Sequence, residues 1–161
     1  MSLNTAQLAT LKTAILADPV LAAQPNTNVG NSVVAGALNA IAAPDFFVWR
    51  TSVEIDEIMR NGMDWTRVDN LTVGKARIWD WMTRLGSFNA SKANIRVGID
   101  AAWVGTAADL AVRATIYTHC KRQALVIEKI LASGTGAIET PATLTREGPI
   151  TPDEIEQARA S

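Results

Sequence analysis

The feature that most constrains the fold is the scarcity of strand-forming sequence. "DFFVWRTS", residues 45–52, is the only run rich in aromatic and β-branched residues. Such a run favours a strand, but one strand alone has no neighbour to pair its backbone donors and acceptors. We therefore interpret it as extended chain that crosses the core. The rest of the chain has the spacing of amphipathic helices, which predicts an all-α fold.

Five amphipathic helices follow from apolar spacing and from residues typical of helix ends. The first has apolar residues three and four apart and ends at Pro19, and the second ends at Pro44. The third is opened by a capping box of Thr51 and Glu54, in which each residue caps the other. The predicted segments are "TAQLATLKTAILADP", "NSVVAGALNAIAAP", "SVEIDEIMRNG", residues 72–85 and "SKANIRVGIDAAWVGT".

A sixth, much longer helical segment covers residues 107–133. Thr106 and Asp109 form a second capping box, and no proline or glycine occurs before Gly134. A bend near "HCKRQ" is compatible with the pattern. We expect a helical bundle of about five to six helices over residues 1–136.

Two tryptophans lie two positions apart in the fourth helix and point about 200° apart. Ile78, Trp81, Met82 and Leu85 follow the i, i+3, i+4, i+7 pattern, so they are predicted to form the buried face. Trp79 lies outside that pattern. It is either a second core contact in a helix packed on both sides, or an anchor at a subunit interface, where tryptophan is enriched.

The last 25 residues are predicted to form an extended arm, residues 137–161. "AIETPATLTREGP" has two prolines and alternating polarity, which is typical of a linker. After it, Thr151 as N-cap, Pro152 at the first helical position and Glu154 at the third predict a short helix. A helix this short is marginal alone, so we expect it to order against a partner.

Composition excludes several protein classes. Hydrophobic residues are 48% and charged residues 19%, which is typical of a folded domain. The net charge is −1, and a near-neutral chain lacks the overall positive charge of a nucleic-acid binder. The first residues do not resemble a signal peptide, and no apolar run approaches the ~20 residues that cross a membrane. A single cysteine, Cys120, is consistent with synthesis in a reducing cytoplasm.

A DNA-reading helix-turn-helix is a weak alternative. Residues 71–99 join two helices through a turn with a glycine, but the connection is longer than in that motif. The second helix has only Lys92 and Arg96 as basic residues. We expect no sequence-specific nucleic-acid binding.

No reacting centre is predicted. His119 and Cys120 are the only histidine and cysteine, but neighbours on a helix point about 100° apart, a poor geometry for a nucleophile and its base. No group of ligands has the spacing of a metal site, and "SGTGAI" follows a helix, so it is a helix terminator and no phosphate-binding loop. We expect a non-enzymatic protein with no cofactor and no metal.

Charge is distributed unevenly along the chain. The predicted long helix has a basic group of Arg113, Lys121, Arg122 and Lys129, while residues 139–161 contain five acidic residues and two arginines. Such a pattern is often a solvated face. It also suits copies that stack beside one another, or a tail that lies on a neighbouring copy, which makes Arg113, Lys121 and Arg122 candidate subunit-interface residues.

Three stretches together resemble a family of small proteins encoded among the virion-structure genes of tailed bacteriophages and prophages. They are "TAQLATLKTAILADP", "VWRTSVEIDEIMRNGMDWTRVDNLTVGKARIWDWMTR" and "LASGTG…PATLTREGPIT", and the resemblance that they indicate extends over nearly the whole chain. Within that context, the size, the helical pattern and the predicted arm are similar to the head-to-tail adaptors, or connectors, of short-tailed phages.

The resemblance implies a virion structural protein, made in the host cytoplasm, that forms a homo-oligomeric ring beneath the portal. Its partners would be portal and tail proteins, with DNA only as passing cargo. Residues 137–161 would be the docking arm, with Leu144, Ile150 and Ile155 as its apolar contacts, and lateral contacts would involve the first two helices and Trp79. Alternatives are another tail component, such as a fibre-attachment or tail-completion protein, and an assembly chaperone absent from mature particles.

Overall fold

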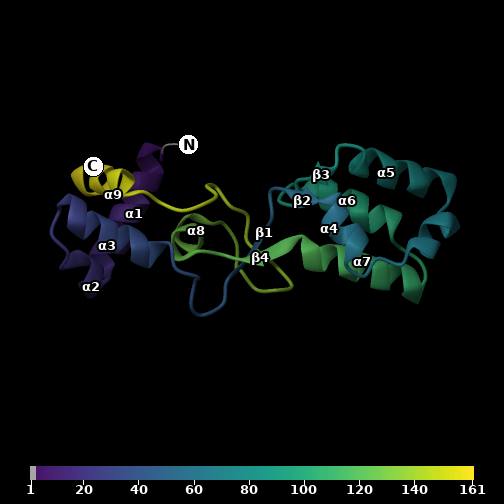
Figure 1. The fold of residues 1–161 in the computed structure, drawn as a ribbon, viewed down its shortest axis with the longest axis horizontal. Helices are drawn as coiled ribbons and strands as arrows, with labels where there is room; N and C mark the ends of the chain where they lie inside the picture. Colours follow the sequence, from purple (N-terminus) through teal and green to yellow (C-terminus); the bar gives the residue numbers. More distant parts are fainter. Residues whose placement is uncertain (1–2) are drawn as a thin grey trace. The chain divides into compact units, whose positions relative to one another are not determined.

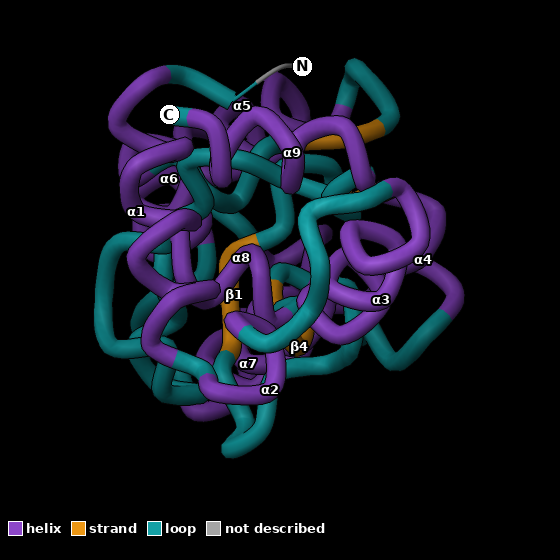
Figure 2. The backbone as a smooth tube through the Cα atoms, turned by 90° about the vertical axis from the view of Figure 1, so that its left-hand side faces the viewer, coloured by secondary structure: helices purple, strands orange, loops and turns teal. Residues whose placement is uncertain are grey.

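The computed structural model describes residues 3–161 and is predominantly helical (Figure 2). Within that range it has nine α-helices, one 3-10 helix and two small two-stranded sheets. The expectation of a mainly helical protein is confirmed, although the helices are shorter and more numerous than predicted and short strands are present. The chain divides into two compact units: unit 1 is Met1–Val48 with Gln123–Ser161, and unit 2 is Trp49–Arg122.

Unit 1 combines helices from both ends of the chain. The first begins where predicted, because the Asn4 side chain accepts a hydrogen bond from the Gln7 amide at 2.9 Å and the Gln7 side chain caps the Asn4 amide in return. Pro19 ends this helix and begins the next. The helices of this unit are α1 (Thr5–Ala17), α2 (Pro19–Ala22), α3 (Asn28–Leu38), α8 (Val126–Leu131) and α9 (Pro152–Ala160).

The C-terminal segment is part of this unit's core, so the prediction of a free docking arm over residues 137–161 is wrong. Helix α9 has the predicted Thr151–Pro152–Glu154 start, and it packs against α1 and α3 (Figure 1). Ile155 is completely buried and Ile150 is buried beside it, in the cluster that contains Leu11. The partner that orders this short helix is the body of the same chain.

Polar contacts fix the same segment in place. The Asn39 amide donates to the Ile150 carbonyl at 2.9 Å and its oxygen accepts from the Ile150 amide at 2.7 Å, so one side chain satisfies both backbone groups. Arg146 pairs with the buried Glu154 at 2.9 Å. These contacts and the buried isoleucines make residues 146–160 an integral part of unit 1.

The remainder of the predicted arm is also held. Leu144 is half-buried against a small cluster of Val48, Ala124 and Ala142, so it too is a contact within unit 1. Gly136 has φ +69°, and a Cβ at that position would lie 2.2 Å from the Phe46 ring. Glycine is therefore required there both for its backbone conformation and for space.

The aromatic run at residues 45–52 has a strand partner that sequence reasoning missed. Strand β1 (Phe47–Trp49) pairs with β4 (Lys121–Gln123), which lies inside the segment predicted as one long helix. That segment is divided into α7 (Ala107–His119), β4 and α8, with the break at the "HCKRQ" bend. The chain passes between the two units within these two strands.

Unit 2 is built around buried tryptophan and isoleucine side chains. Strands β2 and β3 pair antiparallel, with Val53 opposite Phe88, and the Thr106–Asp109 capping box opens α7 as predicted. Trp103, Ile99 and Ile116 are fully buried at its centre. Besides α7, its elements are β2 (Val53–Glu54), α4 (Ile55–Arg60), the 3-10 helix η1 (Trp65–Asn70), α5 (Val73–Thr83), β3 (Ser87–Phe88) and α6 (Ala93–Ala102).

Candidate functional site

A polar cluster in unit 2 joins α4 to the end of α7. Arg50 donates to both Glu57 carboxylate oxygens at 2.8 Å and to the His119 carbonyl at 3.0 Å. The His119 ring contacts Glu57 Oε1 through Nδ1 at 3.3 Å and the Asn61 carbonyl through Nε2 at 3.2 Å. The Arg50 guanidinium lowers the pKa of Glu57 below its usual range. These contacts link α4 to the end of α7 through Arg50, Glu57 and His119.

Cys120 does not join that cluster as a reactive thiol. Its side chain is completely buried among the apolar residues of unit 2. Burial raises the pKa of the Cys120 thiol to about 12, so the thiolate that a nucleophile or a metal ligand requires is disfavoured. The residue acts as a small apolar side chain in the core.

The structure decides between the two alternatives for Trp79 and corrects the prediction that Trp81 is buried. Trp79 is 4% exposed and its ring meets Trp103 edge-on, with centroids 5.4 Å apart and an interplanar angle of 80°. Trp81 is 70% exposed. Trp79 is therefore the core contact, which removes it as an accessible subunit-interface residue, and Trp81 is the outward-facing one.

The packing of α6 against α5 explains why Trp79 is buried and Trp81 is exposed. A Cβ on Gly98 of α6 would lie 2.9 Å from the Met82 sulfur and 3.7 Å from Ile78, so α6 approaches the side of α5 that bears those two residues. Trp79 shares that side, and the helix ends at Thr83, so Leu85 lies beyond it and is 87% exposed. Of the four residues predicted to form the buried face, Ile78 and Met82 are half-buried against the core, whereas Trp81 and Leu85 are exposed.

Trp81 and Leu85 border an apolar groove in unit 2. The groove has a volume of about 400 Å³ and is formed by the end of α5, strand β3 and the start of α6. Phe88 is buried and Met82 and Ile95 are half-buried against the core, so they form its inner surface. Its complete lining is Trp81, Met82, Leu85, Ser87, Phe88, Asn89, Lys92, Asn94 and Ile95.

Unit 1 exposes apolar side chains on its first three helices. No charged residue occurs between Asp18 and Asp45, and several of the larger side chains in this part of the chain point to solvent. These are Leu16, Val20, Val29 and Val33. Exposed apolar side chains that the core does not use are candidate contacts for another protein.

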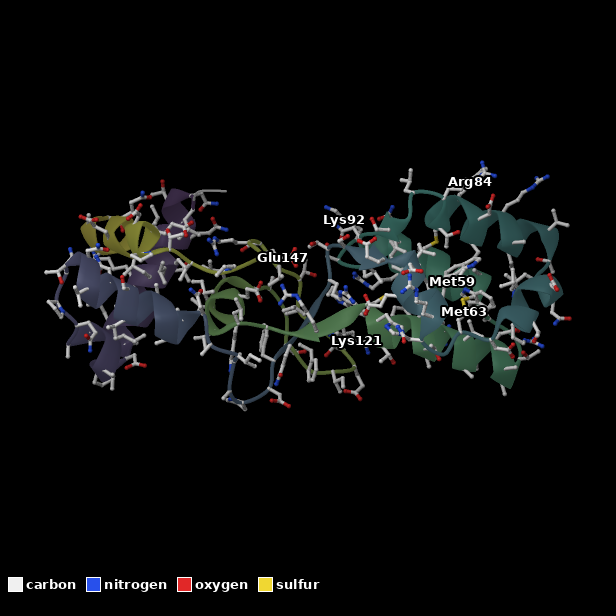
Figure 3. The ribbon with its side chains drawn as sticks, in the orientation of Figure 1. Met59, Met63, Arg84, Lys92, Lys121 and Glu147 are labelled. Carbon is white, nitrogen blue, oxygen red and sulfur yellow. The ribbon has the colours of Figure 1, made fainter. Side chains whose placement is uncertain are left out.

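The predicted basic group is largely engaged within unit 2. Arg113 lies 3.5 Å from Asp100, and the Lys121 ammonium lies 5.8 Å from the centre of the Trp49 ring. Arg122 is half-buried in β4. Lys121 is labelled in Figure 3, on the strand that follows α7. The structure does not group these three with the exposed apolar residues, and their role at a subunit interface remains a prediction.

No protein family, curated protein or solved structure matches the chain. Within residues 3–161, no helix has both the length and the apolar character to cross a membrane. The same residues contain no group of three or more histidine, cysteine or carboxylate side chains placed to hold a metal ion. The candidate site proposed from the structure is the exposed apolar surface of α1 to α3 and the groove at Trp81.

Proposed function

We propose that the protein is a structural component of a tailed-phage particle, an adaptor or connector at the head-to-tail junction, which acts by binding other subunits and catalyses no reaction. The observation that carries the proposal is exposed apolar surface on both units. Leu16 and Val20 lie on unit 1, and Trp81 and Leu85 border the groove of unit 2. Tryptophan contributes more than most residues to protein–protein contacts, so Trp81 is the expected centre of one of them.

The phage context comes from the resemblance of three sequence stretches, and the structure changes how such an adaptor would dock. Residues 137–161 are not available as a free arm, because Ile150 and Ile155 belong to the core of unit 1. Partner subunits would therefore bind surfaces that are already folded, on α1 to α3 and around the end of α5. The partners proposed are the portal, tail proteins and further copies of this chain.

The composition of purified particles tests this proposal. Phage or induced prophage particles are purified by density gradient, and their proteins are quantified by mass spectrometry against the portal protein. An adaptor is expected at a fixed ratio, about one copy per portal subunit. A three- or six-fold copy number would assign the protein to another part of the tail. Absence from mature particles, with presence in assembling ones, would identify an assembly chaperone and contradict the proposal.

A further inference from the structure

The groove at Trp81 has a definite chemical character. Its inner surface is apolar, its walls are the exposed Trp81 and Leu85, and its other polar residues are uncharged. Lys92 is the one charged residue of the lining, and it makes no ion pair with any residue of the described range 3–161. A matching occupant therefore has apolar side chains close to a single carboxylate.

Unit 1 carries such a segment at the corner between α1 and α2. Leu16 is 65% exposed and Val20 is 69% exposed, and the charged residue between them is Asp18. Asp18 caps α2 through one carboxylate oxygen, Oδ1, which accepts from the amides of Val20 and Leu21. Its second oxygen has no hydrogen bond within residues 3–161 and can accept one from an incoming lysine.

The charges of the two units are complementary as well. Unit 1 has 4 basic and 8 acidic residues, whereas unit 2 has 11 basic and 8 acidic residues. Contacts between the same unit of two copies would bring like charges together. Contacts between unit 1 of one copy and unit 2 of another bring opposite charges together, which favours encounter and fixes the relative orientation.

We infer that the Leu16–Val20 corner of one copy occupies the Trp81 groove of a second copy, with Asp18 paired to Lys92. This rests on the proposed function, because it assumes a homo-oligomeric assembly. The contact uses two different surfaces, so every copy offers one groove and one corner. Repetition of such a head-to-tail contact closes into a ring when the rotation between copies allows it. Figure 3 labels Lys92, which projects outward from unit 2.

Pairwise cysteine cross-linking tests the contact directly. Val20→Cys and Leu85→Cys are made separately, with Cys120 left in place because it is buried. The mixture of the two variants is expected to form a disulfide-linked dimer under mild oxidation, whereas neither variant alone should do so, since a head-to-tail contact does not bring identical positions together. Val29→Cys mixed with Leu85→Cys is the matched control, because Val29 is an exposed valine of the same unit.

Equal cross-linking in the mixture and in the control overturns the inference, and so does cross-linking of either variant with itself. A charge exchange gives a second readout by sedimentation velocity. Lys92→Glu should weaken self-association several-fold, and mixing it with Asp18→Lys should restore it. Trp81→Ala should lower the association constant at least tenfold while the circular dichroism spectrum stays unchanged.

The outcomes also separate this inference from the proposed function. A wild-type chain that stays monomeric up to about 1 mM overturns the inference. Self-association that none of these substitutions changes also overturns the inference, and the groove would then bind a different virion protein. If the cross-link forms but the protein is absent from particles, the contact stands and the proposed function fails.

Discussion

Truncation of Trp79 should destabilise the protein far more than truncation of Trp81, although the two residues are two positions apart. Trp79 is 4% exposed and packs edge-on against the fully buried Trp103. A buried tryptophan removes about 200 Å² from water, which at about 25 cal/mol per Å² is worth roughly 5 kcal/mol as an upper bound. Trp81 is 70% exposed, so its removal changes little buried surface.

We expect Trp79→Ala to lower the free energy of unfolding by about 3–5 kcal/mol, including the loss of the aromatic pair. Trp81→Ala should change it by less than about 0.5 kcal/mol. Urea denaturation followed by circular dichroism at 222 nm measures both, and Trp79→Phe is a control that keeps an aromatic ring in the core. The reasoning is refuted if Trp81→Ala costs as much as Trp79→Ala, or if Trp79→Ala costs less than about 1 kcal/mol.

Three further predictions concern other parts of the molecule. Gly136→Ala should destabilise unit 1 by about 1–3 kcal/mol in the same denaturation assay, because φ is +69° and the added Cβ would overlap the Phe46 ring. A destabilisation below about 0.5 kcal/mol would contradict the close approach of Gly136 to Phe46. Hydrogen bonding to Arg67 lowers the pKa of Asp109 to about 2. The stability that the Asp109 carboxylate contributes is therefore fully present at a pH above the ordinary aspartate pKa of about 4, and it is lost as the pH falls toward about 2. Asp109→Asn should therefore be less stable than wild type at pH 7, and the difference should shrink below pH 4; a difference independent of pH would rule out this ion pair as the cause. Cys120 should react with a thiol-modifying reagent only in urea, because it is buried and its pKa is raised to about 12, and rapid labelling of the native protein would contradict its placement.

The sequence predicts helix ends well where side chains cap them. The Thr106–Asp109 and Thr151–Glu154 capping boxes and the start of α1 near Asn4 all occur as expected, because a cap depends on residues within one helical turn. The Thr51–Glu54 pair is an exception. There Glu54 belongs to β2, and α4 starts after it without a side-chain cap.

The register of α5 was not decidable from periodicity. Ile78 and Met82 belong to two different apolar stripes, one that includes Trp79 and one that includes Trp81 and Leu85. Which of the two stripes is buried depends on the side from which α6 packs against α5. Gly98 of α6 allows the close approach that decides it. The groove exists because Trp81 and Leu85 lie outside the buried stripe of α5, so the candidate site could not be predicted without the packing of α6.

The pairing of β1 with β4 and the docking of α9 were missed for a related reason. Both depend on contacts between residues far apart in the sequence, such as Asn39 with Ile150. Each partner taken alone is ambiguous, since residues 121–123 continue an apparently helical segment and residues 152–160 form a marginal helix. Their structure is determined by tertiary contacts, which local patterns do not specify.

If the proposed function holds, other subunits cover the exposed apolar surfaces of this protein in the assembled particle. Hydroxyl-radical footprinting tests it most directly, since tryptophan oxidation depends on exposure. We expect Trp81 to be oxidised in the free protein and protected in purified particles, and Trp79 to be protected in both. Equal oxidation of Trp81 in the free protein and in the particle would show that no subunit covers this surface.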